Sequence, residues 1–267
     1  MNRFNMLFQD KNKKVFMPFF TLGDPDFDRS LTIIDAVIST GIEAIELGFP
    51  FSDPIADGPM NQRSMERALK SGMKFDRCIE LLSVIRIRYP QLAIGLLIYY
   101  NLLFSHGEIA YQKLSQVGVD AVVCADLPLE EAKEHMDLLK KYNIGVVQMI
   151  APNSNDIRVR VLADHSSAFN YVLSGFGTTG VKAEIAPQTL VRIKQVRSLI
   201  DKPMVVGFGI SKPAHVHAVW QAGGNAAIVG SYFTSLIEQN LGNITNAINK
   251  MKQFIQDVHN YALFCST

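Results

Sequence analysis

The sequence predicts an α/β fold, a (β/α)8 TIM barrel that forms one domain over residues 1–267 and carries an extra N-terminal helix. Eight short and nearly continuous apolar runs recur along the chain, as the buried strands of a parallel sheet require. Amphipathic segments of helical length separate them, and no linker, low-complexity tract or charge block interrupts the alternation. A doubly wound open sheet is the alternative, but no GxGxxG motif follows the first run.

The eight apolar runs are the expected strands, and the amphipathic segments are the expected helices. The strands are expected at residues 15–20 (VFMPFF), 44–49 (AIELGF), 93–100 (AIGLLIYY), 121–126 (AVVCAD), 145–150 (GVVQMI), 170–175 (NYVLSG), 204–209 (MVVGFG) and 226–231 (AAIVGS). Several helical segments begin with proline or an acid and end near glycine or asparagine. The helices are expected at residues 26–40, 75–89, 110–118, 129–142, 187–200, 213–224, 231–239 and 241–262.

Composition disfavours several classes of protein. The formal net charge is +1 at pH 7, so the basic footprint of a general nucleic-acid-binding protein is missing. No apolar run is long enough to span a bilayer, and the N-terminal segment lacks the features of a signal peptide. The three cysteines, Cys78, Cys124 and Cys265, are far apart, which fits a reducing compartment. We therefore expect a cytoplasmic protein with neither nucleic-acid nor membrane partners.

Glu46 is the first candidate for chemistry, because it lies in the middle of the apolar run AIELGF. Side chains alternate along a strand, so the bulky Ile45 and Leu47 form one face and Glu46 lies on the other. In a barrel the bulky face packs on the helices, which directs Glu46 inward, near the carboxyl-terminal mouth. A carboxylate buried there costs several kcal/mol unless it is paired or used. We predict a catalytic role for Glu46.

Three more acids are expected at the same mouth. Asp53 and Asp57 follow Glu46 in the loop SDPIADGP, where each precedes a proline or a glycine. Such pairs are common in turns, so the residues alone leave a turn role open for both acids. Asp126 ends the fourth run, and a cap on the helix beginning near Leu129 is an equal alternative for it.

Glycine-rich loops follow three consecutive expected strands, at residues 174–180 (SGFGTTG), 207–211 (GFGIS) and 229–233 (VGSYF). Barrels often bind phosphate with the loops after the seventh and eighth strands, through backbone N–H groups and a helix N-terminus. Tight turns alone would explain one such loop. Three of them at these positions favour a phosphate monoester as the ligand.

A phosphate-binding barrel could be an isomerase, an aldolase, an epimerase or a decarboxylase. The absence of certain residue types narrows this set of reactions. No expected strand contains the lysine of a Schiff-base aldolase. All six histidines fall in helical or helix-flanking segments, so a metal cluster at the strand ends is not expected. Carboxylate chemistry without a metal or cofactor remains. A flat apolar group on the ligand is indicated by the expected mouth residues Phe19, Leu97, Tyr99, Val123, Tyr171 and Phe208.

Seven motifs, in this order, give the chain its resemblance to a known family. They are PFFTLGDPD from Pro18, ELGFPFSDPIADGP from Glu46, YYNLLF from Tyr99, ADLPLEE from Ala125, YVLSGFGTTG from Tyr171, VGFGIS from Val206 and VGSYF from Val229. Over essentially its full length the chain resembles the tryptophan synthase α-subunit family, and the second motif is highly specific. The resemblance implies a carbon–carbon lyase of tryptophan biosynthesis, which cleaves indole-3-glycerol phosphate to indole and glyceraldehyde 3-phosphate by a retro-aldol reaction.

The resemblance also implies roles for individual residues. Glu46 is implied to move the proton that the reaction needs, and Asp57 to accept a hydrogen bond from the indole N–H. Tyr171 is implied to orient Glu46. The other implied substrate-binding residues are Phe19, Leu97, Tyr99 and Val123 at the indole, Thr179 and Gly180 in the loop after the sixth strand, and Phe208, Gly209, Gly230 and Ser231 at the phosphate.

A partner follows from the same resemblance. It is a β subunit, which holds pyridoxal phosphate in a heterotetramer of two α and two β subunits, while no metal or cofactor is expected in this chain. Asp53 is implied to form a salt bridge across the interface. Thr178, Tyr100 and Val229 depart from the common pattern, and none of them alters Glu46 or Asp57.

Three alternatives remain at this point. Another phosphate-binding barrel of the same pathway is disfavoured, because indole-3-glycerol-phosphate synthase needs a lysine on an inner strand. A lyase that releases indole without a β subunit and a non-catalytic regulatory barrel subunit stay open.

Overall fold

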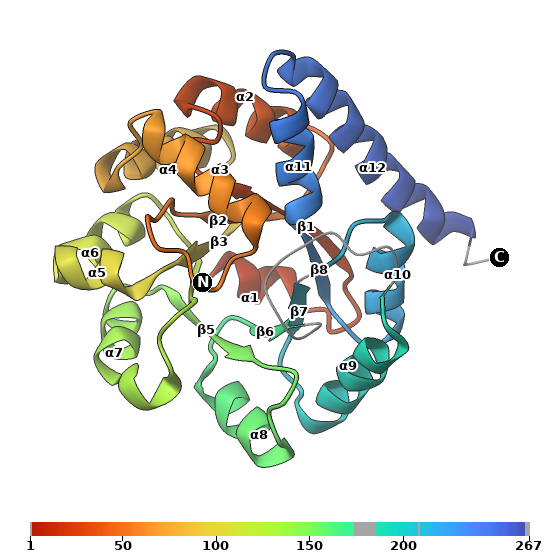
Figure 1. Ribbon diagram of the computed structural model, residues 1–267. Helices are drawn as coiled ribbons and strands as arrows, with labels where there is room; N and C mark the ends of the chain where they lie inside the picture. Colours follow the sequence, from red (N-terminus) through yellow and green to blue (C-terminus); the bar gives the residue numbers. More distant parts are fainter. Residues whose placement is uncertain (1, 174–184, 208, 265–267) are drawn as a thin grey trace.

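Eight parallel strands form a closed barrel in the computed structural model, which describes residues 2–173, 185–207 and 209–264 (Figure 1). The strands are β1 Val15–Thr21, β2 Ala44–Gly48, β3 Ala93–Ile98, β4 Ala121–Cys124, β5 Gly145–Ile150, β6 Asn170–Leu173, β7 Met204–Gly207 and β8 Ala226–Val229. Each strand pairs with the next along the chain, and β8 pairs with β1 to complete the ring. The predicted (β/α)8 barrel is confirmed, and the open doubly wound sheet is excluded.

Helices surround the outside of this barrel, and one further helix, α1, lies across its end (Figure 1). They are α1 Arg3–Leu7, α2 Phe27–Ile38, α3 Pro59–Lys70, α4 Phe75–Arg88, α5 Tyr100–His106, α6 Glu108–Gln116, α7 Lys133–Lys141, α8 Asp156–His165, α9 Pro187–Leu199, α10 Pro213–Gln221, α11 Ser231–Gln239 and α12 Ile244–Phe264, with a 3-10 turn at Leu129–Glu131. The expected extra N-terminal helix is α1, and the expected tail helix is α12. None of the helices in the described ranges is both long and apolar enough to cross a membrane.

The two faces of each strand pack in different layers, which decides the direction of Glu46. Ile45 and Leu47 belong to the outer core between the strands and the helices. Ala44 belongs to the inner cluster that fills the barrel. Glu46 pairs in register with Phe19 of β1 and lies on the same inward side as Ala44. The prediction that Glu46 points into the barrel is therefore confirmed.

Helix α1 closes the amino-terminal end of the barrel, and it crosses the centre of the ring in Figure 1. Phe4 and Phe8 belong to the same inner cluster as the residues that fill the barrel. The Phe4 ring lies edge-on against Phe169, with 4.9 Å between the ring centroids. A Cβ atom on Gly95 would stand 3.1 Å from the end of the Met17 side chain, which is tighter than an ordinary contact, and 3.5 Å from the tip of the Phe4 ring. Glycine on β3 therefore leaves room for Met17 in the inner cluster.

Asp120 holds α1 in that position from the start of β4. Its carboxylate accepts hydrogen bonds from the Arg3 guanidinium at 3.0 Å and from the Arg86 guanidinium at 2.9 Å. It also accepts the backbone N–H of Ile94 at 2.9 Å. Only 4% of Asp120 is exposed, so each of these donors offsets the loss of hydration of a buried charge. One carboxylate thus connects α1, α4 and β3.

Candidate active site

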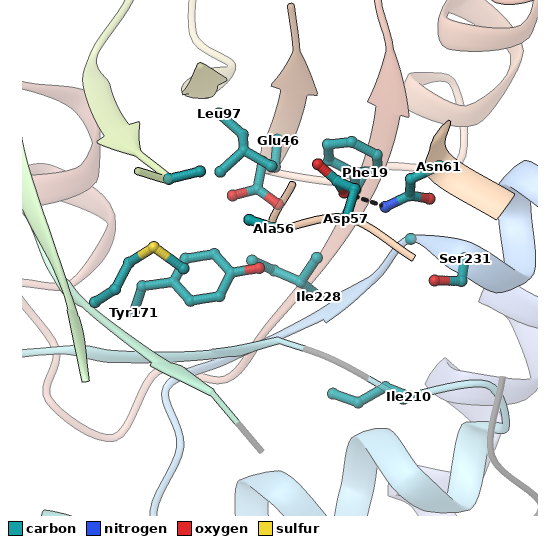
Figure 2. Close-up of a pocket in the computed structure, with 14 residues that line it drawn as sticks. Phe19, Glu46, Ala56, Asp57, Asn61, Leu97, Tyr171, Ile210, Ile228 and Ser231 are labelled. Atoms are coloured by element: carbon teal, nitrogen blue, oxygen red, sulfur yellow. Dashed lines mark hydrogen bonds between the residues drawn. The ribbon is translucent and has the colours of Figure 1, made fainter. Parts of the chain in front are cut away.

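A cavity opens at the carboxyl-terminal ends of the strands (Figure 2). Its described lining residues are Phe19, Glu46, Ala56, Asp57, Asn61, Leu97, Ala125, Met149, Tyr171, Gly209, Ile210, Ile228, Gly230 and Ser231. Eight of these are residues that the sequence predicted: Phe19, Glu46, Asp57, Leu97, Tyr171, Gly209, Gly230 and Ser231. The fold thus brings together side chains from strands and loops that are far apart in the sequence.

Glu46 is the most deeply buried acid of the cavity, with 1% of its surface exposed. Its Oε1 atom is buried and has no hydrogen-bond partner among the described residues. Burial raises the pKa of Glu46 to about 8, and the negative charge of Asp57 contributes to the same direction. Glu46 therefore carries a proton at neutral pH and can give it up to a group inside the cavity.

Asp57 is also buried, but it is surrounded by donors. Its carboxylate accepts the Tyr99 hydroxyl at 2.7 Å and the Asn61 side-chain amide at 2.9 Å. Burial raises the pKa of Asp57, and these two hydrogen bonds act in the opposite direction. Two neighbouring acids with different surroundings favour different protonation states: burial keeps Glu46 protonated, whereas the two donors around Asp57 stabilise its ionised form.

The residues next to Asp57 in the sequence explain its position at the cavity. Gly58 caps the N-terminus of α3 and Pro59 occupies its first turn, so the chain must enter the helix directly after Asp57. The Gln62 side chain donates to the Asp57 carbonyl oxygen at 2.8 Å. The backbone N–H of Ala56 donates to the Tyr99 hydroxyl at 3.1 Å. The loop is therefore held both from its own helix and from the end of β3.

Tyr171 of β6 enters the cavity from another side (Figure 2). A Cβ atom on the neighbouring Gly207 of β7 would overlap the Tyr171 hydroxyl, so this position must lack a side chain. Burial raises the pKa of Tyr171 well above its usual value, and the charges of Glu46 and Asp57 add to the effect. The hydroxyl stays protonated and is available as a hydrogen-bond donor inside the cavity.

The other end of the cavity is suited to an anion. Gly230 precedes α11, Ser231 is the first residue of that helix, and both line the cavity. Gly209 follows β7 with φ of +72°, a conformation that favours glycine. A helix N-terminus presents unpaired N–H groups and a positive dipole end to an anion. No lysine or arginine is among the described lining residues, so the donors that they offer to an anion are neutral.

Several predicted residues lie elsewhere. Tyr99 is not among the described lining residues; it lies behind Asp57, and its ring stacks on Phe51 with 5.0 Å between centroids. Val123 is buried in the inner cluster and does not reach the described cavity wall. Asp53 is exposed on the loop and accepts the Ser52 hydroxyl at 2.5 Å. Three predicted residues fall outside the described part of the chain, namely Thr179, Gly180 and Phe208.

Asp126 proves to cap a helix, although not the one near Leu129. Its carboxylate accepts the backbone N–H of Tyr100, the first residue of α5, at 2.7 Å. The predicted cap on the helix near Leu129 is therefore wrong, since Asp126 bonds the first turn of α5 instead.

Sequence reasoning missed part of the cavity wall. The missed residues are Ala56, Asn61, Ala125, Met149, Ile210 and Ile228. For Asn61 a signal existed, because it stands four residues after Asp57 at the start of a helix, a spacing that brings two side chains to one face. The apolar residues carried no such signal.

Lysine, histidine and the other possible metal ligands bear on the alternative chemistries of such a barrel. None of the eight described strands contains lysine. Within the described ranges, no three His, Cys, Asp or Glu side chains are grouped closely enough to hold a metal ion. His215 and His217 are buried packing residues of α10.

A closed parallel barrel with two buried acids and a helix N-terminus around one cavity at the carboxyl ends of its strands is typical of a (β/α)8-barrel enzyme. Comparison with known proteins makes the assignment more specific. The family model described as "Tryptophan synthase alpha chain" matches residues 6–263. The chain belongs to this family, which confirms the resemblance found in the sequence.

Individual relatives agree over nearly their whole length. The tryptophan synthase alpha chain of Photobacterium profundum is 39% identical over 262 residues, which cover 97% of each chain. The corresponding chain of Cronobacter sakazakii is also 39% identical over 262 residues, with the same coverage. A chain in the solved tryptophan synthase complex of Pyrococcus furiosus is 31% identical, with a TM-score of 0.84 over 92% of this chain and 98% of that one.

Proposed function

We propose that this chain cleaves indole-3-glycerol phosphate to indole and glyceraldehyde 3-phosphate, with Glu46 moving the protons and Asp57 binding the indole N–H. Family membership makes the chain a lyase of tryptophan biosynthesis. The observation that supports these residue roles is the pairing of a buried Glu46, with its pKa at about 8, and a hydrogen-bonded Asp57 in one cavity.

The first step protonates the ring. The bond between C3 of indole and the glycerol side chain can break only after C3 has become tetrahedral. Protonated Glu46 transfers its proton to C3, and the ring becomes a cationic indolenine whose positive charge is centred on the ring nitrogen. Asp57 accepts the N–H hydrogen bond and stabilises that charge, because its carboxylate is held in place before the reaction.

The second step breaks the carbon–carbon bond. The Glu46 carboxylate removes the proton from the hydroxyl group on the carbon next to C3. That oxygen forms the aldehyde of glyceraldehyde 3-phosphate, and the electrons of the broken bond return to the ring, which regains the neutral indole. Glu46 ends the cycle protonated, so no external acid or base is consumed.

The ends of the cavity fit the two ends of this substrate. Phe19, Leu97 and Ile228 offer apolar surface for the indole ring. The phosphate would lie at Gly230 and Ser231, where the α11 N-terminus supplies N–H donors. Tyr171 would donate a hydrogen bond from its hydroxyl to a polar group near Glu46, and this contact would keep the Glu46 carboxyl group oriented.

We also propose a partner subunit, on the carboxyl-terminal face of the barrel. The relative from Pyrococcus furiosus is described in a tryptophan synthase complex of two α and two β subunits. In this chain Ile55 is 77% exposed and Phe104 is 69% exposed, on segments that directly follow β2 and β3. Exposed large apolar side chains on this face, with Ile55 in the same loop as the acid Asp53, fit a protein interface. Pyridoxal phosphate would belong to that β subunit alone.

Indole release from indole-3-glycerol phosphate tests the proposal. Purified wild-type chain, Glu46→Gln and Asp57→Asn are compared with and without a β subunit, and circular dichroism checks that each variant is folded. We expect turnover in the wild type, stimulation by the β subunit, and loss of turnover in both variants.

The other outcomes separate the alternatives. Fast turnover that a β subunit does not change would indicate a lyase that works alone. A folded wild-type chain without turnover under any condition would refute the catalytic roles of Glu46 and Asp57 and leave a regulatory barrel subunit.

A further inference from the structure

We propose that Asn61 is a positioning residue for the reaction: its amide fixes the Asp57 carboxylate and connects it to Thr234 on the helix that begins at the anion end of the cavity. This inference rests on the proposed function of Asp57. Figure 2 shows the Asn61 amide nitrogen directed at the Asp57 carboxylate.

The hydrogen bonds of Asn61 fix the orientation of its amide. An ionised carboxylate can only accept, so the Asn61 nitrogen must be the group that faces Asp57, at 2.9 Å. The amide oxygen then points the other way, where it accepts the Thr234 hydroxyl at 3.3 Å. Asn61 is 3% exposed, so water cannot readily replace either partner. One rotamer of Asn61 satisfies both neighbours, and a flipped amide would oppose oxygen to oxygen.

Thr234 extends the hydrogen bonds of Asn61 to the anion end of the cavity. It lies one turn into α11, and its backbone N–H donates to the carbonyl oxygen of Gly230 at 3.0 Å. Gly230 and Ser231 of the same turn line the cavity. A continuous set of hydrogen bonds therefore runs from the Asp57 carboxylate through Asn61 and Thr234 to the first turn of α11.

Charged residues hold α3 and α11 together farther along the same interface. Arg63 of α3 donates to both carboxylate oxygens of Glu238 on α11, at 2.7 and 2.9 Å. Arg67 donates to Glu238 at 2.9 Å and to Asp24 at 2.8 Å. Bidentate and shared arginine pairs fix geometry as well as distance. Asn61 and Thr234 thus face each other across two helices that these ion pairs also connect.

The charge on Asp57 depends on this arrangement. The ionisable side chain that acts on Asp57 is Tyr99, at the end of β3. The charge of Asp57 in turn raises the pKa of Glu46 of β2 and of Tyr171 of β6, and Asp126 acts on Tyr99 in the same direction. The charge of Asp57 and that of an ionised Glu46 disfavour each other. Only Tyr99 and Asn61 offset the burial of the Asp57 carboxylate, among the causes acting on its pKa. Without the Asn61 amide, the pKa of Asp57 should rise.

The test uses Asn61→Leu, which keeps the size of the side chain and removes its amide. Turnover of indole-3-glycerol phosphate is measured against pH, and the Asp57 carboxyl carbon is titrated by NMR in ¹³C-labelled protein. We expect the acid limb of kcat and the Asp57 titration to move up together by about one pH unit, with kcat lowered about tenfold at pH 7.

Two further variants make the result specific. Thr234→Val leaves Asn61 in place but frees its oxygen side, so both readouts should shift in the same direction by a smaller amount; it also carries the test if Asn61→Leu does not fold. Gln62→Met is the matched control, because Gln62 lies next to Asn61 but bonds the Asp57 main chain, and it should leave the Asp57 titration in place.

The inference would be overturned by an unchanged Asp57 titration in folded Asn61→Leu, or by an equal shift in Gln62→Met. The NMR readout needs no turnover. A wild-type chain that does not cleave the substrate would therefore refute the proposed function, while the Asp57 titration still decides whether Asn61 controls that carboxylate.

Discussion

The Tyr99 hydroxyl donates a 2.7 Å hydrogen bond to the Asp57 carboxylate, and the same hydroxyl accepts the backbone N–H of Ala56 from the loop that carries Asp57. One phenol thereby fixes both the charge and the main chain of this segment. Sequence reasoning had expected Tyr99 in the wall of the cavity. The structure gives it a role one layer farther from the proposed substrate.

Tyr99→Phe should lower kcat by roughly tenfold at pH 7, because a hydrogen bond to a charged group contributes about 1.5–3 kcal/mol. The pKa of Asp57 should rise in the variant, since one of its two stabilising donors is gone. Steady-state indole release measures the first effect. Tyr142→Phe is the control, because that hydroxyl bonds Glu108 at the surface, and equal losses in both variants would contradict the assignment.

Glu46→Gln should change the pH dependence of stability as well as abolish turnover. The folded pKa of Glu46 is about 8, above the reference value of 4.5, so the folded chain holds a proton that the unfolded chain releases between these values. The stability of the wild type therefore falls as pH rises through this window. Glutamine removes that loss, and the variant should gain stability relative to wild type, by an amount on the order of a few kcal/mol at pH 8.

Urea unfolding of Glu46→Gln and wild type at pH 5 and pH 8 checks this expectation. At pH 5 the two proteins should differ little, because Glu46 is protonated in the folded wild type. A difference that does not change with pH would show that Glu46 is ionised in the folded chain.

Gly207→Ala should impair activity more than stability. The added methyl group would overlap the Tyr171 hydroxyl, so the ring must move away from the cavity. Overpacking of this kind costs about 1–3 kcal/mol, whereas displacement of a group at the reacting centre by 1 Å lowers the rate about 100-fold. Thermal unfolding and indole release measure the two effects. The double variant Gly207→Ala, Tyr171→Phe relieves the overlap with the hydroxyl and should recover part of the stability.

Asp120→Ala should destabilise the barrel without altering its chemistry. The carboxylate is buried beside Arg3 and Arg86, and its removal leaves two guanidinium groups without a counter-charge. Loss of one partner in such a buried group costs roughly 3 kcal/mol. Urea unfolding measures the loss, with Asp137→Asn as a control that removes an exposed pair on α7. Equal stability of the two variants would mean that α1 is not held by Asp120.

The eight strands could be predicted from the sequence because a parallel barrel covers both faces of every strand. Each strand is therefore an apolar run. Glu46 could be predicted as a site residue for the same reason, because its charge interrupts one of these apolar runs. Ile210, Ile228 and Met149 were not, because an apolar residue gives no sign of whether it faces a helix or a cavity.

Tyr99 and Asn61 show a different limit. Their partners are far away in the chain or depend on how two helices meet: Tyr99 reaches Asp57 across two neighbouring strands, and Asn61 meets Thr234 only because α3 lies against α11. Local spacing placed Asn61 near Asp57 but could not supply its second partner. The motifs predicted the residues of the site, whereas the hydrogen bonds that hold them come from tertiary packing.

Because α1 closes one end of the barrel, it affects the side on which small molecules can enter and leave. Phe4 and Phe8 belong to the cluster that fills the barrel, so their rings occupy its amino-terminal end. Among the described residues, the cavity of the proposed site opens at the carboxyl-terminal ends of the strands, so substrate and products would pass on that side. A protein that docks over this opening would receive a released product before bulk water does.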